Sequence, residues 1–309
     1  MKKLSIIIPC YRSQDTLPIV VRDCISKMDK IAGRDYEIIL VNDCSPDGVL
    51  KVMQDLCAQY PNIKGIDLAK NFGQHAAIMA GLSIVSGALC IFLDDDGQTP
   101  IDEVDKLLAA LDDDTDAVYA KYPHIKQSLF RIFGSKINDI MAQILIDKPK
   151  GIRLTSYFVC KRFLADEILH YHNAYPYLGG LVFRSTKKIK NIEISHKERI
   201  SGDSGYTIKK LLSLWLNGFT AFSVKPLRIA TFAGFCFSIL GFIMTAYTVI
   251  SKILKSDMLL GYSSTMAVLL FIGGMLMLML GIIGEYIGRI YISINNAPQY
   301  VIRKIINKN

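Results

Sequence analysis

Three consecutive carboxylates, Asp94, Asp95 and Asp96, end an apolar, strand-like stretch over residues 89–93. Like charges this close repel one another unless a cation lies among them. The Asp-x-Asp pair can offer two oxygens to Mg²⁺ or Mn²⁺ and leave coordination positions for a diphosphate, which is typical of an enzyme that uses a nucleotide sugar. The alternative is a solvated acidic turn, favoured by the Gly and Pro that follow.

Residues 1–224 alternate apolar, strand-like segments with amphipathic helical patterns, as in a mostly parallel α/β sheet. We expect strands over residues 4–8, 37–41, 63–68, 89–93 and 117–120. We expect helices over about 16–30, 48–59, 73–86 and 102–112. Ligands bind such sheets at the carboxyl ends of the strands. Polar segments follow four of the expected strands, at residues 9–11, 42–48, 70–75 and 94–98.

Hydrophobic residues make up 51% of the 309 residues and concentrate in two nearly charge-free runs, about 229–250 and 266–284. Each run is close to the ~20 residues that a bilayer-spanning helix needs. A buried core helix is the alternative for the second run, but two runs joined by a short loop favour a transmembrane hairpin. We therefore expect a globular domain over 1–224, the hairpin over 225–288 and a basic tail over 289–309.

Basic residues flank both apolar runs, with Lys225 and Arg228 before the first and Arg289, Arg303 and Lys304 after the second. This distribution predicts that the domain and the tail are both cytoplasmic. No signal-peptide pattern precedes the domain, and seven Cys without a C-x-x-C pair indicate neither a disulfide framework nor a zinc site. The net charge of +8 accompanies the membrane runs, so we expect an anionic leaflet or phosphate ligands and no nucleic acid.

The chain resembles glycosyltransferase family 2 with the GT-A fold, in the branch that transfers sugars to polyprenyl phosphates. Four segments carry the resemblance: residues 5–11, 70–81, 93–100 and 284–291, the last reading Gly-Glu-Tyr-Ile-Gly-Arg-Ile-Tyr. It implies a Rossmann-like GT-A domain, a nucleotide-sugar donor that is expected to be a UDP-sugar, and undecaprenyl phosphate as acceptor. We also expect Mg²⁺ or Mn²⁺ as the cofactor and a protein that crosses the inner membrane more than once. A homo-oligomer is one of the possible assemblies.

The resemblance also assigns the donor residues. The nucleotide would be bound by Pro9, Tyr11, Asp43, Asp94 and Asp95. The metal would be held by Asp94, Asp96 and Gln98. Asp43 would accept a hydrogen bond from the base or ribose, or could instead cap the helix that follows it. The family often has Asn-Glu and Asp-Asp where this chain has Arg12-Ser13 and Asn42-Asp43, which leaves the base and the sugar open.

Two further features concern phosphate binding. The backbone amides of Gln74 and His75 lie at the start of an expected helix and could face donor phosphates. The His75 side chain is either a ligand or acid, or an ordinary half-buried histidine.

An apolar stripe at helical spacing over 128–146 predicts a core-facing or an interfacial helix, and we favour the interfacial one. The resemblance implies that Lys121, Arg131 and Ser135 meet the lipid phosphate and that Arg199 closes over both substrates as a catalytic residue.

The departure that concerns catalysis lies at Thr155. Relatives commonly place an aspartate, proposed as general base, before an Arg-Arg pair, which is Lys161-Arg162 here. A lipid monophosphate has a second pKa of about 6 and can attack without a base. Two other classes stay open: a processive polysaccharide synthase, although the lone Trp215 lacks its Gln-x-x-Arg-Trp element, and a non-catalytic scaffold with a degenerate domain.

Overall fold

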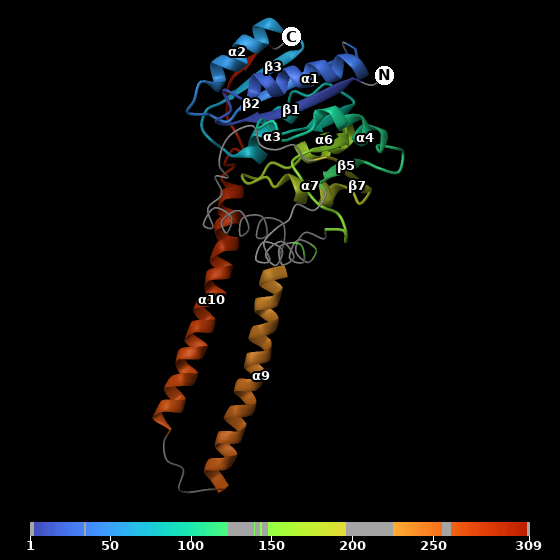
Figure 1. The fold of residues 1–309 in the computed structure, drawn as a ribbon. Helices are drawn as coiled ribbons and strands as arrows, with labels where there is room; N and C mark the ends of the chain where they lie inside the picture. Colours follow the sequence, from blue (N-terminus) through green and yellow to red (C-terminus); the bar gives the residue numbers. More distant parts are fainter. Residues whose placement is uncertain are drawn as a thin grey trace. The chain divides into compact units, whose positions relative to one another are not determined.

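The computed structural model divides into two compact units (Figure 1). One unit comprises Met1–Trp215 together with Asn296–Asn309, and the other is Leu216–Asn295. The residues described are 3–33, 35–122, 139, 143, 148–195, 225–254 and 261–307. The first unit therefore contains residues from both ends of the chain.

A mixed sheet forms the centre of the first unit. Its eight strands in the described part of the chain are β1 (Leu4–Cys10), β2 (Tyr36–Asn42), β3 (Ile63–Leu68), β4 (Leu89–Phe92), β5 (Ala117–Lys121), β6 (Phe158–Lys161), β7 (Ile189–Glu193) and β8 (Ile302–Ile306). They lie in the order β7-β5-β6-β4-β1-β2-β3-β8. Strands β4, β1, β2 and β3 are mutually parallel, so their carboxyl ends meet at one edge.

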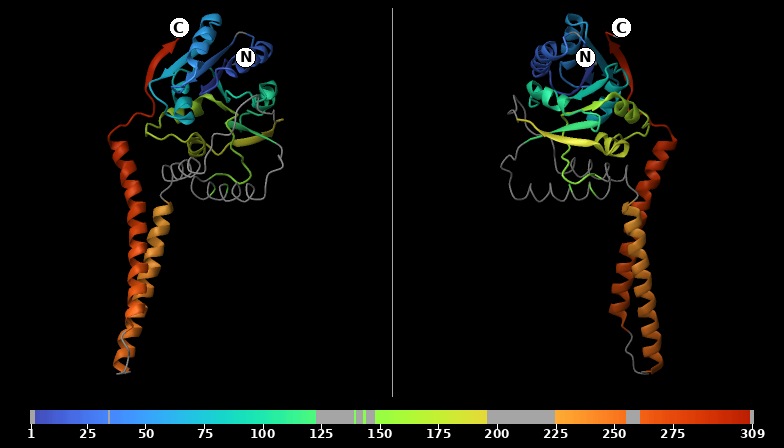
Figure 2. Two further views of the ribbon diagram at one scale, coloured as in Figure 1. Left: turned by 60° about the vertical axis from the view of Figure 1, so that its left-hand side comes forward. Right: turned by 90° about the vertical axis from the view of Figure 1, so that its right-hand side faces the viewer.

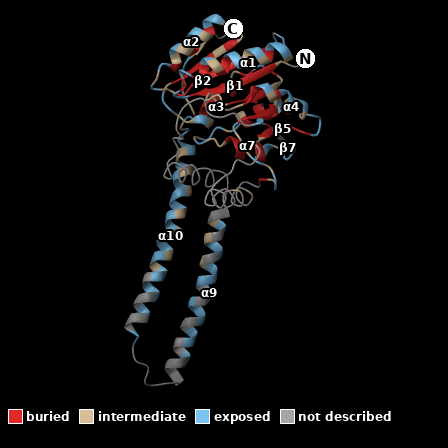
Figure 3. Cartoon of the chain, in the orientation of Figure 1, coloured by how far each residue is buried: buried red, intermediate tan, exposed pale blue. Residues whose placement is uncertain are grey.

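Helices cover both faces of this sheet. They are α1 (Leu17–Ile31), α2 (Val49–Gln59), α3 (Gln74–Leu82), α4 (Val104–Ala109), α6 (Arg162–Leu169) and α7 (Leu178–Ser185), with a short 3₁₀ turn at Ile101–Glu103. Helix α1 is amphipathic because its buried residues, among them Val20, Cys24 and Met28, recur at helical spacing. Figure 3 shows the buried residues concentrated in the sheet and in the helix faces that cover it.

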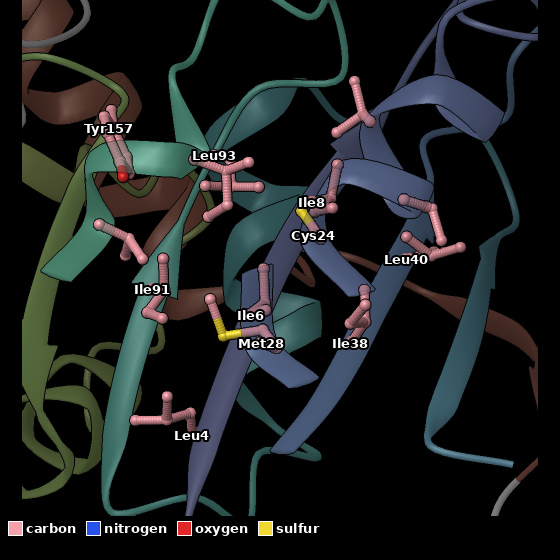
Figure 4. Packing of buried hydrophobic residues seen from close by; sticks show 14 of the residues in the cluster. Leu4, Ile6, Ile8, Cys24, Met28, Ile38, Leu40, Ile91, Leu93 and Tyr157 are labelled. Atoms are coloured by element: carbon pink, nitrogen blue, oxygen red, sulfur yellow. The ribbon is translucent and has the colours of Figure 1, made fainter. Parts of the chain in front are cut away.

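Alternation along β1 produces two cores. Ile6 and Ile8 pack with α1 residues in one cluster, which Figure 4 shows from close by. On the other face, a Cβ added at Gly81 of α3 would lie 2.6 Å from Cγ2 of Ile7 and 3.2 Å from Cγ2 of Val41. Glycine at this position therefore lets α3, which begins at the polar edge, approach the strands closely.

The five strands expected from the sequence are present as β1–β5, and the expected α/β alternation is confirmed. The expected tail over 289–309 is different in the structure, because residues 302–306 form β8, antiparallel to β3 (Figures 1 and 2). Apolar contact and hydrogen bonding both favour this pairing. Ile306 packs against Gly65, and Asn307 Nδ2 donates to the Ile63 carbonyl at 2.8 Å.

The second unit contains α9 (Lys225–Leu254) and α10 (Tyr262–Ile294), both longer than the expected runs. Among the described residues, one stretch, Phe271–Ile294 of α10, is long and apolar enough to cross a membrane. The apolar stretch Ala230–Ile243 of α9 is shorter. The two helices meet at Phe237 and Phe271, whose ring centroids lie 5.4 Å apart.

Candidate functional site

The candidate site lies at the edge where β4, β1, β2 and β3 end. The backbone N–H of Tyr11, just after β1, donates to Oδ2 of Asp95 at 2.9 Å. The Thr16 hydroxyl donates to the Asp95 carbonyl at 2.7 Å. Burial raises the pKa of Asp95, and the Tyr11 hydrogen bond partly offsets this rise. Asp95 thus joins the loops that follow β1 and β4.

Asp94 is held by two neutral donors. Gln74 Nε2 donates to Oδ1 at 2.7 Å, and the Ser156 hydroxyl donates to Oδ2. Burial, with the charges of Asp96 and Asp95, raises the pKa of Asp94 to about 6. Since neither Gln74 nor Ser156 carries charge, the repulsion within the triplet is relieved by protonation or by an added cation.

The turn after Asp96 is stabilised by the backbone conformation of Gly97 and by a local hydrogen bond. Gly97 has a φ of +75°, and the backbone N–H of Gln98 donates to Oδ1 of Asp96 at 2.9 Å. The described residues include no group of three or more His, Cys, Asp or Glu that could hold a metal ion by themselves. Asp94 and Asp96 nevertheless suit a hard divalent cation that takes its other ligands from a diphosphate and water.

Asp43 lies at this edge with both carboxylate oxygens engaged. Oδ1 accepts the backbone N–H of Phe72 at 2.7 Å, and Oδ2 accepts that of Gly73 at 2.8 Å. Gly73 has a φ of +90°, which favours glycine. Burial raises the pKa of Asp43, and these two hydrogen bonds lower it. Asp43 therefore fixes the loop before α3, and its contact with a nucleotide stays a prediction.

Asp43 does not cap α2, whose N-cap is Gly48 and has no side-chain cap hydrogen bond. Asp47 Oδ1 accepts the backbone N–H of Val49, the first residue of α2, at 3.3 Å. Asp47 Oδ2 accepts the backbone N–H of Gln14 at 3.1 Å, which ties the loops after β1 and β2 together. The alternative role in capping α2 is therefore wrong for Asp43, because its carboxylate points to the next loop.

The β1 loop presents an aromatic ring to solvent. Tyr11 is 43% exposed, and the Arg12 guanidinium lies 5.6 Å from the centre of its ring. Arg12 has a φ of +57°, and its backbone N–H donates to the Ser45 hydroxyl at 2.7 Å. Pro9 lies within β1, opposite Val41 of β2. The predicted nucleotide residues thus come from adjacent strand ends, and Tyr11 offers a face for a planar base.

His75 does not have the properties of an acid at neutral pH. Burial lowers its pKa to about 4, and its ring lies edge-on to Tyr177 with centroids 5.4 Å apart. Its buried Nδ1 has no hydrogen-bond partner among the described residues. These features favour the ordinary half-buried histidine of the two interpretations.

Thr155 and Lys121 both have partners within the domain. The Thr155 hydroxyl lies 3.0 Å from the Ala120 carbonyl and 2.9 Å from the Tyr157 carbonyl, and its single O–H is shared between these two acceptors. Lys121 Nζ forms an ion pair with Glu193 at 2.7 Å on the exposed end of β5. Apart from residues 139 and 143, the expected interfacial helix lies outside the described residues, as do Arg131, Ser135, Arg199 and Trp215.

Two contacts of the site were not predicted. The Ser156–Asp94 contact spans 62 residues and depends on the antiparallel pairing of β6 with β4. Gln74 was expected to offer its backbone amide at the start of α3, but its side chain reaches Asp94. A polar residue at the first position of a helix that follows a strand end is the signal that could have identified Gln74.

Comparison with known families covers most of the chain. Residues 5–169 match the family described as Glycosyl transferase family 2, and residues 225–290 match the GtrB C-terminal hairpin. The chain is 33% identical over 311 residues to the undecaprenyl-phosphate 4-deoxy-4-formamido-L-arabinose transferase of Yersinia enterocolitica, covering 99% of this chain and 94% of the relative. The protein of that name from Salmonella paratyphi B is 32% identical with the same coverage.

Solved structures agree on the fold. Glucosyl-3-phosphoglycerate synthase from Mycobacterium tuberculosis, in complex with Mn²⁺, UDP-glucose and phosphoglyceric acid, is similar with a TM-score of 0.52 at 13% identity. The match covers 70% of this chain and 76% of that one. At this identity the likeness concerns the fold alone, and it confirms the expected GT-A arrangement of the strands.

Proposed function

Because this chain belongs to glycosyltransferase family 2, we propose that it transfers a sugar from a UDP-sugar to undecaprenyl phosphate with inversion at the anomeric carbon. The observation that carries this proposal is the polar edge where Asp94, Asp95 and Asp96 meet the loops after β1 and β3. Similarity to named undecaprenyl-phosphate sugar transferases along the full chain supports the acceptor.

The donor binds along this edge in the proposed mechanism. The Tyr11 ring stacks on the base, and Asp95 holds the Tyr11 loop through its backbone N–H. Asp94, Asp96 and Gln98 would hold Mg²⁺ or Mn²⁺. When bound, the cation neutralises charge that develops on the departing diphosphate. Gln74 and Ser156 keep the Asp94 carboxylate oriented toward the ligand, since each donates to one of its oxygens.

The acceptor supplies its own nucleophile. An undecaprenyl phosphate is largely ionised at pH 7, because its second pKa is about 6. Thr155, whose hydroxyl is bonded to backbone carbonyls, is then a structural residue and no replacement for a general base. Lys121, Arg131, Ser135 and Arg199 are proposed to bind the lipid phosphate and to close over it.

The fold of both chain ends supports the proposed membrane arrangement. Residues up to Trp215 and from Asn296 onward belong to the same compact unit, and β8 pairs with β3. A chain that leaves and re-enters one sheet crosses the membrane an even number of times. If α10 spans the bilayer, the apolar α9 is the partner that we propose for the second crossing. We therefore propose a two-helix hairpin in the inner membrane with the GT-A domain in the cytoplasm.

A transfer assay with the purified full-length protein tests the function. Labelled UDP-sugars, together with GDP- and dTDP-sugars, are supplied with undecaprenyl phosphate and Mn²⁺, and lipid-linked label is extracted. We expect transfer from one UDP-sugar, and loss of transfer with EDTA. The matched control is Asp114→Asn. Asp114 lies shortly before β5, and its exposed carboxylate forms an ion pair with Lys188. Label incorporated into a growing polymer, or transfer from a GDP-sugar alone, would contradict the proposal.

A further inference from the structure

Strand β8 contains a bulge at Arg303. Leu68 pairs with Ile302 and Asp67 pairs with Lys304, so Arg303 is the extra residue opposite this step. A bulge turns the side chain of its extra residue away from the regular alternation of the strand. Here it directs the guanidinium toward the carboxyl end of β3, where the polar edge begins.

Arg303 binds the last residues of β3 and the residue after it. Its Nη2 donates to the Ala69 carbonyl at 2.9 Å, and its Nη1 lies 3.6 Å from Oδ2 of the buried Asp67. Oδ1 of Asp67 accepts Nδ2 of Asn42 at 2.7 Å. In the preceding peptide unit, the Ala69 N–H donates to the Val301 carbonyl at 2.9 Å. Ala69 is therefore held by β8 through both of its backbone polar groups.

The loop that follows Ala69 is the loop that reaches Asp94. Asn71 Nδ2 donates to the Asp43 carbonyl at 3.3 Å, and the next two N–H groups bind the Asp43 carboxylate. Gln74 then donates to Asp94. We name residues 69–74 the donor loop. It has three anchors, at β8, at Asp43 and at Asp94, and the first is supplied by the chain segment after the two long helices.

The geometry points to Arg303 as a positioning residue for the donor loop, so that the C-terminal strand sets the affinity for the nucleoside diphosphate. This inference rests on the proposed function, because it places the donor at the edge that contains Asp94. Arg303 is not a catalytic residue, since its contacts are with backbone and with Asp67. Its planar fork serves Ala69 and Asp67 at once, which a lysine ammonium cannot do in the same way.

Binding of nucleoside diphosphates to the full-length, detergent-solubilised protein provides the test. The wild type is titrated calorimetrically with UDP, GDP, CDP and dTDP in the presence of Mn²⁺, and the tightest ligand is used afterwards. We expect Arg303→Ala to weaken its binding about three- to tenfold, a moderate effect because the guanidinium is partly exposed. Arg303→Lys should recover part of the loss.

The neighbouring Lys304→Ala serves as the matched control, because Lys304 is an exposed basic residue of the same strand. It should bind the nucleotide as the wild type does. In the transfer assay, Arg303→Ala should raise the donor KM by the same factor and leave the KM for undecaprenyl phosphate within twofold. A purely structural role would instead lower the Tm of Arg303→Ala with unchanged nucleotide affinity, and that result would overturn the inference.

Failure of the proposed function has a different signature. If the wild type prefers GDP, the proposed donor is contradicted, and if it transfers to another acceptor, the proposed acceptor is contradicted. In both cases the comparison of Arg303→Ala with Lys304→Ala still applies to the nucleotide that binds. Binding of no nucleoside diphosphate to the wild type would overturn both. Equal nucleotide affinity in the wild type and Arg303→Ala would overturn the positioning role alone.

Discussion

The three aspartates after β4 have different partners although they are consecutive. Asp95 binds the backbone after β1, Asp96 binds its own turn, and Asp94 is oriented by two side chains. Burial, with the charges of Asp96 and Asp95, raises the pKa of Asp94 to about 6. A half-buried carboxylate with neutral donors and two acidic neighbours is stabilised in its ionised form by a cation.

Replacing the charge at either proposed metal ligand should abolish most of the activity. Asp96→Asn and Asp94→Asn preserve shape and remove an ionised oxygen ligand, so we expect kcat to fall roughly 10²-fold or more. Titration of Mn²⁺ into the UDP-bound protein should show weakened metal binding in both variants, and Asp114→Asn should match the wild type. Full turnover of the Asn variants in metal-depleted buffer would refute the assignment.

Two adjacent hydroxyls should differ in their importance. Ser156→Ala removes a donor to Asp94, and we expect about a fivefold to tenfold loss of kcat/KM with little change in Tm. Thr155→Ala removes a hydrogen bond to the backbone, so its main effect should be a lower Tm, and its activity loss should stay below the ~10²-fold expected for a general base. A rate gain with Thr155→Asp would show instead that this position handles a proton or a cation.

At the scale of the elements, apolar runs made β1–β5 predictable, while β7 and β8 lack that signal. The β7 sequence Ile-Lys-Asn-Ile-Glu is half polar, and β8 reads Ile-Arg-Lys-Ile-Ile, which resembles a basic membrane-flanking tail. The carboxyl edge was predictable because strands joined by helical crossovers run parallel, so their carboxyl ends meet at one edge. Contacts such as Ser156 with Asp94 depend on pairing across distant segments, and no local pattern encodes them.

The beginning of β2 contains a buried charge that connects three strands. Glu37 accepts hydrogen bonds from Lys64 at 2.8 Å, from Ser5 at 2.6 Å and from the backbone N–H of Ser86 at 2.6 Å. Burial opposes its ionisation, yet these hydrogen bonds prevail and lower the pKa of Glu37 to about 2. The ionised carboxylate therefore stabilises the fold where β1, β2 and β3 begin.

Glu37 should make stability depend on pH. Its folded-state pKa lies below the usual value near 4.5, so its contribution is complete above about pH 4.5 and disappears as the pH falls toward 2. We expect Glu37→Gln to lower the free energy of unfolding by about 3 kcal/mol at pH 7, and the difference from wild type to shrink between pH 4.5 and 2.

Thermal unfolding in detergent at several pH values measures this difference. Asp105→Asn is the control, because Asp105 pairs with Lys27 at 2.9 Å but is largely exposed. We expect this change to lower the free energy of unfolding by less than about 1 kcal/mol. If the difference in the free energy of unfolding between Glu37→Gln and the wild type stays constant from pH 7 to pH 2, the shape of the side chain and not its charge accounts for the lower stability.

For the whole molecule, the return of the chain to the sheet constrains the topology more strongly than hydropathy does. One stretch of α10 passes the length and composition criteria for a membrane span, while the pairing of β8 with β3 requires both ends of the helix pair to lie on one side. The proposed hairpin satisfies both observations.

The full-length protein should remain with membranes through high salt and alkaline wash and require detergent for release, because inserted helices are not held by screened charges. Epitope tags placed at Met1 and Asn309 should both resist protease added outside spheroplasts, and both should become accessible after lysis. Release by salt would contradict insertion, and a C-terminal tag cleaved in intact spheroplasts would contradict an even number of crossings.

The position of β8 after the two long helices also affects how the protein is made. Domains fold from the N-terminus during synthesis, so β3 forms while its outer edge still has unpaired N–H and C=O groups. The strand that covers this edge is synthesised after both long helices. A chain interrupted before residue 301 would contain the acidic triplet but leave β3 uncovered and prone to aggregation. Completion of the sheet therefore waits for synthesis of both long helices.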